Sequence, residues 1–477
     1  MLTQLEIISL APGDIFILIL FFAIILLIGG KFIRTKGKLL DFIIGGRTLT
    51  LPIFVLTLFS TWYGGILGIG EFGFSYGISS WVLQGVPYYI FAAIFALVFA
   101  KRARREEVAT IPDQLEKVYG RKVAYVGALF TGILSCPAPY ILMFAVLLQI
   151  VTAWSLMTCL LIGTFSSLFY LWFGGFKADV ATDMFFGIIM VLSFMVILPF
   201  LYLKFGGYSY LLQNLPPLHL KWHGGNSAQF IIMWFFIALW TFIEPTFYQR
   251  CYAAKSETVA VRGILISVVF WFLFDVMTIT AALYSKAAFQ NLDQPMLAFP
   301  LLANLVLPSF WKGFFFAGMF ATIISTLNSQ LFVSGMSLGR DLVWKMRGEG
   351  KEREIYWTRI GMLLSASLCI WISIKIPSVV KLWYSIGTVI VPGLLVAMIS
   401  TFFPWMRISK NWMMATMLAG FFISLFCLSW GWRNEVGAYD QYPFGIEPMF
   451  PGLLISIFIW VWGKWVGRAD KIGQEKP

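Results

Sequence analysis

Long apolar runs recur along the whole chain, and they constrain its fold more than any other feature. A helix needs about 17 to 25 mostly apolar residues to cross the hydrocarbon core of a bilayer. Runs of about this length lie at 14–33, 50–70, 80–100, 123–151, 153–173, 180–203, 228–249, 260–285, 311–339, 356–374, 380–402, 411–431 and 450–467. They predict an all-α integral membrane protein with about thirteen transmembrane helices and no large soluble domain.

The positively charged residues predict how these helices are oriented. If the N-terminus lies outside, 28 of the 35 lysines and arginines fall on the inner side and 7 on the outer side. Cytoplasmic loops of membrane proteins carry such an excess. We therefore expect a multi-pass protein of the inner (plasma) membrane, with its N-terminus outside and its C-terminus cytoplasmic.

Composition and motifs argue against several classes of function. Only 12% of the residues are charged, whereas soluble proteins have about 25%. The net charge of +12 does not indicate nucleic-acid binding, because the basic residues lie in short loops between apolar runs. The sequence has no GxxxxGK[ST] motif, which argues against ATP-driven transport. No Ser/His/Asp or Cys/His constellation lies within the runs, so we expect no enzyme.

Two of the predicted spans contain residues that interrupt a helix. The second span has four glycines between residues 64 and 70, and each weakens a helix by up to about 1 kcal/mol relative to alanine. The seventh contains Glu244-Pro245, and proline removes an amide donor and frees carbonyl groups. Transporters form binding sites where such broken helices meet near the middle of the bilayer. Close helix packing would also explain the glycines, and a simple kink would explain the proline.

The ninth span carries a stripe of hydroxyl side chains. Thr322, Ser325, Thr326 and Ser329 recur at helical spacing, so they share one face, and Asn328 lies beside them. Oxygen dipoles of this kind can replace the hydration shell of a hard cation. Hydrogen bonds between helices or to the helix's own carbonyls would explain the stripe equally well.

Acidic residues inside the predicted spans indicate function, because desolvating an unpaired charge costs several kcal/mol. Asp275 lies in the middle of the eighth span, and Glu244 lies at the break of the seventh. For both, a role along a transport pathway is favoured. Asp179 and Asp183 lie near the start of the sixth span, where pairing with Lys177 or helix N-capping is an equally good interpretation.

Five segments, in this order along the chain, resemble the sodium/solute symporter family, which includes sugar, proline, pantothenate, sialate and choline transporters. They are Trp62-Tyr63-Gly64-Gly65 leading to Gly70-Glu71, Gly174-Gly175 through Thr182-Asp183, Tyr248-Gln249-Arg250 with Ala253 through Ser256, Ala321 through Gln330, and Gly339-Arg340-Asp341. The first of them, together with Leu382-Trp383-Tyr384, is most similar to the choline-transporter branch. That likeness does not fix the substrate.

The resemblance implies a LeuT-like fold with two inverted repeats of five helices, one helix before them and two after. The corresponding regions are an N-terminal helix and basic loop at 1–47, a first repeat at 48–204, an external loop at 205–227, a second repeat at 228–403, and two final helices with a short cytoplasmic tail at 404–477.

The resemblance also implies a sodium site between the second and ninth spans. Its ligands would be the backbone carbonyls of Ser60, Tyr63 and Thr322 and the hydroxyls of Ser325 and Thr326. Some members have a second sodium site, whose matching positions here are Asp183, Ser325, Asn328 and Ser329. Asn328 replaces a residue that is often Asp or Ser, which puts the second ion in doubt.

Matching positions in sugar-transporting members place a substrate-binding amide where this chain has Glu244. Gly64 and Gly65 would leave space beside it, and Trp62 and Phe242 would form aromatic walls. We expect a solute with a cationic nitrogen or several hydroxyls, such as an amine, an amino acid or a polyol. Secondary contacts would come from Asp275 and Glu71.

The leading hypothesis is therefore a symporter that imports a small polar organic solute with Na+ by alternating access. Its partners would be the solute, sodium ions and the lipid bilayer, with no nucleic acid. One alternative is a proton-coupled symporter that uses Glu244, Asp275 or Asp183. A membrane sensor built on a transporter scaffold is an alternative of another class, although such sensors usually carry a cytoplasmic signalling domain.

Overall fold

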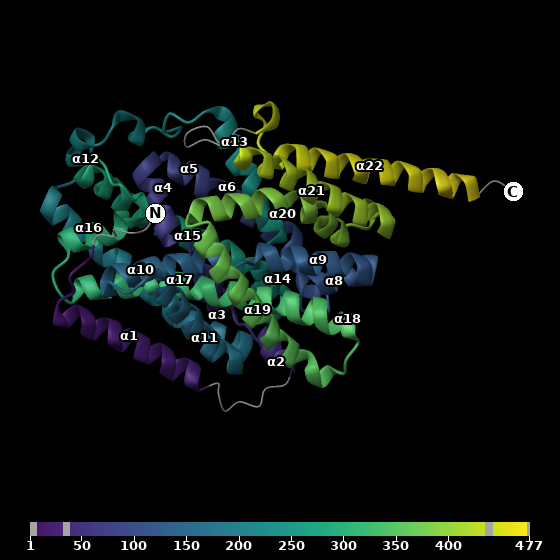
Figure 1. The fold of residues 1–477 in the computed structure, drawn as a ribbon, viewed down its shortest axis with the longest axis horizontal. Helices are drawn as coiled ribbons and strands as arrows, with labels where there is room; N and C mark the ends of the chain where they lie inside the picture. Colours follow the sequence, from purple (N-terminus) through teal and green to yellow (C-terminus); the bar gives the residue numbers. More distant parts are fainter. Residues whose placement is uncertain (1–6, 32–38, 435–441, 475–477) are drawn as a thin grey trace.

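The computed structural model describes residues 7–31, 39–434 and 442–474, and these form an assembly of packed helices (Figure 1). Extended pairing within them is limited to one isolated bridge between Leu49 and Ala254. The all-helical fold class predicted from the apolar runs is confirmed. A chain within a bilayer satisfies its backbone hydrogen bonds inside each helix, which is why the runs become helices.

The helices follow the predicted spans closely. In the first half they are α1 (Pro12–Gly30), α2 (Leu39–Ile44), α3 (Leu51–Trp62), α4 (Ile66–Tyr76), α5 (Ser79–Gln84), α6 (Val86–Ile94), α7 (Lys101–Arg105), α8 (Ile111–Tyr119), α9 (Arg121–Leu134), α10 (Ala138–Thr152) and α11 (Leu156–Phe205). The 3-10 helix η1 (Gly45–Arg47) follows α2, and the π-helical segment η2 (Phe95–Ala100) joins α6 to α7. Within the run 123–151, a break at Pro137 separates α9 from α10.

The second half begins with α12 (Tyr208–Asn214) and continues to the last helix. Its helices are α13 (Ala228–Ile237), α14 (Pro245–Ala253), α15 (Glu257–Phe289), α16 (Ala298–Val306), α17 (Trp311–Gly335), α18 (Lys345–Arg347), α19 (Glu354–Lys375), α20 (Val379–Phe402), α21 (Lys410–Arg433) and α22 (Met449–Gln474). Short 3-10 helices lie between them: η3 (Pro217–Leu220), η4 (Ala238–Ile243), η5 (Pro295–Leu297), η7 (Lys351–Arg353), η8 (Pro404–Met406) and η9 (Pro443–Gly445). A π-helical segment, η6 (Met336–Trp344), continues α17.

Among the described residues, 11 helices are long and apolar enough to cross a membrane, and the bent pair α3 and α4 brings the number to 12. The pair is bent by 58°. Helix α11 has 50 residues and covers two of the predicted spans. It has a non-helical residue at Gly175 (φ 52°, ψ −139°), so its two parts run in different directions. The sequence-based count of thirteen treats these two parts separately, and it stays a prediction.

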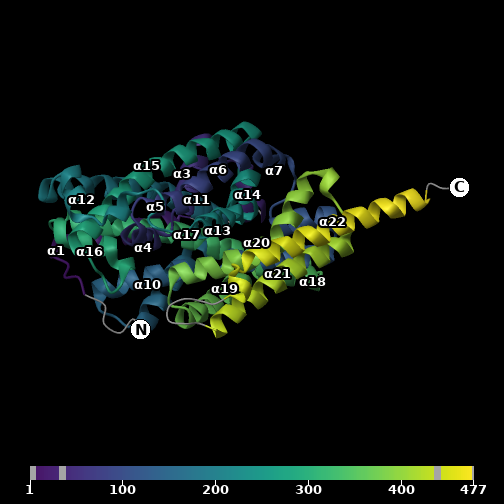
Figure 2. The same cartoon turned by 90° about the horizontal axis from the view of Figure 1, so that it is seen from above.

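Helix α17 lies at the centre of the molecule. All of its most apolar 18-residue window is buried, and it packs against α1, α10, α11 and α19. Helices α21 and α22 pack against each other along one edge (Figures 1 and 2). Large apolar side chains such as Leu27, Leu97 and Phe165 point outward, as expected for surfaces that contact lipid. The hydroxyl stripe of α17 is therefore inside the protein, remote from this lipid-facing surface.

The bend of α11 depends on Gly175. Its φ of +52° is one that residues with a side chain rarely adopt, and a Cβ atom there would lie 2.6 Å from the carbonyl oxygen of Phe42. The glycine thus lets α2 pack against the bend and turns the second part of α11 toward α17. That second part carries Asp179 and Asp183.

We predict that Gly175→Ala destabilises the protein by roughly 1–3 kcal/mol, because it combines backbone strain with a steric clash. Thermal unfolding of the purified protein in detergent measures this as a lower melting temperature. Gly348→Ala is the matched control, since Gly348 also has a positive φ (65°) but has no atom within 4 Å of the added Cβ. Equal melting temperatures for the Gly175 variant and the wild type would contradict the assignment.

Candidate functional site

The break in the second span brings backbone close to α17 and α20. A Cβ on Gly64 would lie 2.0 Å from Oγ1 of Thr326, and one on Gly65 would lie 2.2 Å from the Trp383 ring. Both glycines are thus needed for close approach, as well as for ending α3. Packing and helix interruption, which the sequence left as alternatives, occur together here.

The break in the seventh span is organised by Glu244. Its backbone is extended between η4 and α14 (φ −68°, ψ 112°), and Pro245 occupies the first turn of α14, where a missing amide hydrogen costs nothing. The Glu244 carboxylate caps the helix by accepting from the Thr246 amide (3.1 Å) and hydroxyl (2.8 Å). It also accepts from Nε1 of Trp240 (2.6 Å). The break is therefore a defined N-cap rather than a simple kink.

The two breaks face one cavity with about 1070 Å³ of empty space, including the part open to solvent. Half of its lining residues are aromatic, and the carboxylates of Glu244 and Asp275 are the acidic groups that line it. No lysine or arginine is among the described residues around it. The Trp62 ring, for example, lies with its centroid 5.0 Å from that of Phe247 and 5.4 Å from that of Tyr88. The cavity thus presents negative charge and aromatic faces.

Asp275 is held by tyrosine hydroxyls. Tyr63 and Tyr89 both donate to its carboxylate, and the Tyr63 hydroxyl also lies 2.9 Å from Oγ1 of Thr278. These donors stabilise the carboxylate without bringing a positive charge to it. Tyr63 belongs to the break of the second span, so it connects that break with Asp275 on α15.

The structure separates the seven residues expected to contact substrate into two groups. Those that line the cavity are Trp62, Gly65, Glu244 and Asp275. The residues outside this lining are Gly64, Glu71 and Phe242.

Each of these three has a physical reason for its place. Gly64 packs on Thr326. Ile69 and Phe72 line the cavity, so Glu71 points from a different face of α4. The Phe242 ring packs against other phenylalanine rings, and its carbonyl oxygen accepts from the Tyr248 hydroxyl at 2.8 Å.

The positions expected to bind sodium are all buried; they lie on α3 and the break after it, on α17 and, for Asp183, on α11. The Thr326 hydroxyl donates to the Thr61 carbonyl (2.5 Å), and the Ser325 hydroxyl donates to Oδ1 of Asp183 (2.5 Å). Each hydroxyl uses its single hydrogen in these bonds, so its lone pairs remain for a cation. Because α3 ends at Trp62, carbonyls of its last turn, including that of Ser60, have no intrahelical partner.

Thr322 uses its hydroxyl within its own helix, where it donates to the Gly318 carbonyl at 2.7 Å. This agrees with the expectation that only its carbonyl would serve as a ligand. The described residues at this position thus supply hard oxygen atoms, which are the atoms that sodium prefers. The sodium ligand set stays a prediction that these contacts favour.

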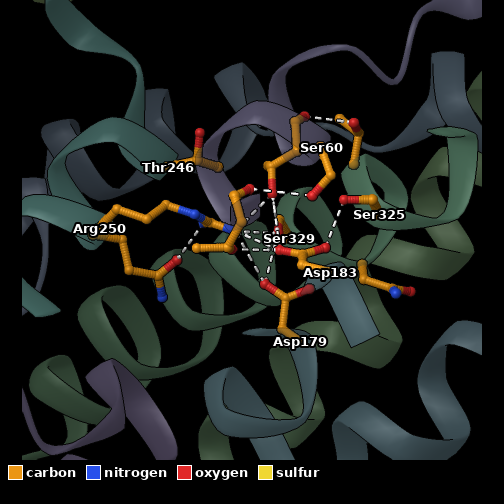
Figure 3. Close-up of polar contacts among 12 residues, drawn as sticks. Ser60, Asp179, Asp183, Thr246, Arg250, Ser325 and Ser329 are labelled. Carbon is orange, nitrogen blue, oxygen red and sulfur yellow. Dashed lines mark hydrogen bonds and ion pairs between the residues drawn. The ribbon is translucent and has the colours of Figure 1, made fainter. Parts of the chain in front are cut away.

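An ion-pair cluster lies beside these hydroxyls (Figure 3). Asp183 accepts from the hydroxyls of Thr57 (2.6 Å) and Thr61 (3.0 Å). Nη2 of Arg250 lies 3.2 Å from Asp183 and 3.4 Å from Asp179, and all three charged groups are fully buried. The Ser329 hydroxyl donates to Asp179 at 2.6 Å.

This cluster corrects the alternatives considered for the two aspartates. They do not pair with Lys177, which instead lies 3.2 Å from Asp41, and they lie inside α11, not at its N-cap. In the sequence, Arg250 was part of a motif and was counted with the basic residues on the inner side, whereas the structure buries it. An arginine directly after the seventh apolar run was the available signal, but its partners come from distant helices.

A second ion-pair network joins α8 to the segment after α17. Asp113 accepts from Arg340 (3.0 Å) and Lys345 (2.5 Å), and Arg340 also pairs with Asp341 and Glu354. Burial alone would raise the pKa of Asp113, but the charges of Arg340 and Lys345 lower it to about 2. The stabilisation from this group is therefore complete above its ordinary pKa near 4 and is lost only as the pH falls toward 2.

Comparison with known proteins gives matches along nearly the whole chain. The sequence profile of the sodium:solute symporter family matches residues 42–420. The sodium/proline symporter 2 of Staphylococcus saprophyticus is 24% identical over 92% of this chain and 90% of its own length. The sodium/pantothenate symporter of Escherichia coli is 26% identical over 70% of this chain and 73% of its own length.

Solved structures with the same fold are transporters. A Na+-coupled sialic acid symporter in a substrate-bound, outward-open state has a TM-score of 0.78 at 14% identity, over 96% of this chain and 98% of that one. A transporter of the nucleobase-cation-symport-1 family in a closed conformation has a TM-score of 0.57 at 10% identity, over 88% of this chain. The predicted LeuT-like fold is thereby confirmed.

Proposed function

The chain belongs to the sodium:solute symporter family and imports a solute with sodium, and on that premise we propose that its solute is a small molecule with a positively charged nitrogen. The observation that carries this proposal is the charge of the cavity. Its lining has two carboxylates, those of Glu244 and Asp275, and many aromatic rings, but no basic side chain among the described residues.

An amine satisfies such a cavity better than an anion would. The aromatic faces attract a cation within about 6 Å, with about 2 kcal/mol or more when the site is dry. A carboxylate solute would find no lysine or arginine there, and the N-terminus of α14 is already capped by Glu244. An amino acid or a polyol is less favoured, although each could use the hydroxyls of Tyr63 and Tyr89 in part.

The two broken helices give a direct route by which sodium and solute influence each other. The proposed sodium ligands Ser60 and Tyr63 flank the end of α3, and the side chain of Tyr63 donates to Asp275 in the cavity. Sodium bound at this break would fix the Tyr63 backbone and thereby hold Asp275 in place for the solute. Transport of sodium and solute would be coupled because both bind one conformation of the protein more tightly than the other.

We place the two five-helix repeats at 48–204 and 228–403, with the N-terminus outside and the C-terminus in the cytoplasm. The excess of lysine and arginine in the inner loops supports this orientation. On this arrangement the network around Asp113 and Arg340 lies on the cytoplasmic side, where it would hold α8 against the end of α17 and keep the inner gate closed.

We predict that the double variant Ser325→Ala/Thr326→Ala raises the sodium concentration for half-maximal uptake about tenfold or more, because two oxygen ligands are lost. Uptake into proteoliposomes under a sodium gradient measures this, with the solute that gives the largest sodium-dependent thermal shift. Ser334→Ala on the same helix is the control, since its hydroxyl donates to the Gly132 carbonyl. An unchanged sodium dependence in the double variant would reject the site.

We also predict that Glu244→Gln and Asp275→Asn each weaken binding of a cationic solute about tenfold, or roughly 1.4 kcal/mol, since each removes a negative charge. Unlabelled choline, proline and sorbitol compete with the transported solute in the uptake assay, and choline should compete best. Glu71→Gln is the control, because Glu71 lies outside the cavity lining. Competition by none of the three, with unaltered affinity in Glu244→Gln, would contradict the proposal.

A further inference from the structure

We propose that the guanidinium of Arg250 occupies the second cation position of the fold, so that each transport cycle carries one sodium ion. This inference rests on the proposed sodium site between α3 and α17. It concerns the place that the resemblance assigns to a second ion, with Asp183, Ser325, Asn328 and Ser329 as ligands. Two of these four residues, Asp183 and Ser329, are in contact with the guanidinium of Arg250.

The terminal nitrogen of Arg250 already has the surroundings of a bound cation. Nη2 lies within 3.4 Å of five oxygen atoms from three helices, although it has only two hydrogens to donate. These atoms belong to Thr61 (2.7 Å), Ser329 (2.7 Å), Thr57 (3.2 Å), Asp183 (3.2 Å) and Asp179 (3.4 Å). Figure 3 shows Arg250 reaching into this group from one side, with Asp179, Asp183 and Ser329 facing it.

Arg250 competes with a second sodium ion for two of the four expected ligands, Asp183 and Ser329. Ser329 accepts from Arg250 and donates to Asp179, and Ser325 donates to Asp183. Asn328 donates from its amide nitrogen to the Tyr170 hydroxyl, and its Oδ1 atom has no hydrogen-bond partner among the described residues. A second ion would have to displace a guanidinium that is tethered to the chain, and the local concentration of a tethered group exceeds that of free sodium.

The balance of buried charge leads to the same conclusion. When both are ionised, Asp179 and Asp183 carry two negative charges, and Arg250 supplies one positive charge; all three side chains are fully buried. One sodium ion at the proposed site would supply the second positive charge. It would lie next to Asp183, because Ser325 can donate to Asp183 while its lone pairs face the ion. One ion therefore makes the cluster neutral, whereas two would leave an uncompensated positive charge in a medium of low dielectric constant.

The position of Arg250 also links this cluster to transport. Arg250 lies on α14, directly after the break that Glu244 caps, while both aspartates lie on α11 of the other repeat. Phe176 covers the guanidinium, with its ring centroid 5.5 Å from the Arg250 Cζ atom. The broken helices move against the rest of the fold during alternating access. Arg250 would move with α14, to which it belongs, while the sodium ion leaves the protein.

The ratio of sodium to solute entering proteoliposomes tests the proposal. We measure initial uptake of radioactive sodium and of radiolabelled solute side by side, and we expect one sodium ion per solute molecule in the wild type. A ratio of two overturns the proposal while leaving sodium-coupled uptake intact. Solute uptake without sodium entry would instead reject the proposed sodium site itself, so the two failures can be told apart.

Two variants of Arg250 sharpen the test. Arg250→Lys keeps the charge, and it should keep the ratio of one and a non-cooperative dependence on sodium. Arg250→Ala vacates the position, and its sodium dependence should become cooperative, with the ratio moving toward two. If Arg250→Ala changed neither the ratio of sodium to solute nor the cooperativity of the sodium dependence, the proposal would be wrong.

Asp179→Asn provides an independent test if Arg250→Ala fails to fold. It removes one negative charge from the balanced cluster, so sodium binding should weaken about tenfold while the ratio stays at one. Asp41→Asn is its matched control. Asp41 lies on α2 and pairs with Lys177, but it pairs with neither Arg250 nor Asp183. Equal sodium affinity in the two variants would contradict the charge balance.

Discussion

A helix that stops inside the membrane leaves backbone groups without partners, and the structure of this site follows from how those groups are satisfied. Helix α3 ends at Trp62, and its carbonyls turn toward the hydroxyl face of α17. Helix α14 begins inside the protein, and Glu244 caps its free amides. One break thus supplies oxygen atoms suited to a cation, and the other fixes a carboxylate beside the aromatic cavity. The break after α3 depends on Gly64 and Gly65, and the break before α14 depends on Pro245.

Buried charges divide the site into two regions with different chemistry. In the cavity, Glu244 and Asp275 are stabilised by neutral donors, so their charges remain available to a cationic solute. In the adjoining cluster, Asp179 and Asp183 both form ion pairs with the guanidinium of Arg250. Sodium at the break would lie between these regions. Its proposed ligands would connect it to one region through Ser325 and to the other through Tyr63.

Much of this arrangement could be predicted from the sequence, because its signals are local. The apolar runs predicted the helices, and the spacing of Thr322, Ser325, Thr326 and Ser329 predicted that their hydroxyls share one face of α17. Other features depend on contacts between helices far apart in the sequence. Arg250 joins acids that lie on α11, and a tyrosine of the second-span break meets a tyrosine of α6 at Asp275. Glu71 was expected to be a secondary contact of the solute, but α4 presents Ile69 and Phe72 to the cavity instead.

The central claim is that sodium and a cationic solute bind to one conformation through the shared break. Calorimetric titration of the purified protein tests it by measuring the affinity for choline with and without sodium, and for sodium with and without choline. The account predicts that each ligand tightens the other by the same factor, because coupling between two sites is reciprocal. Affinities that do not depend on the other ligand would contradict it.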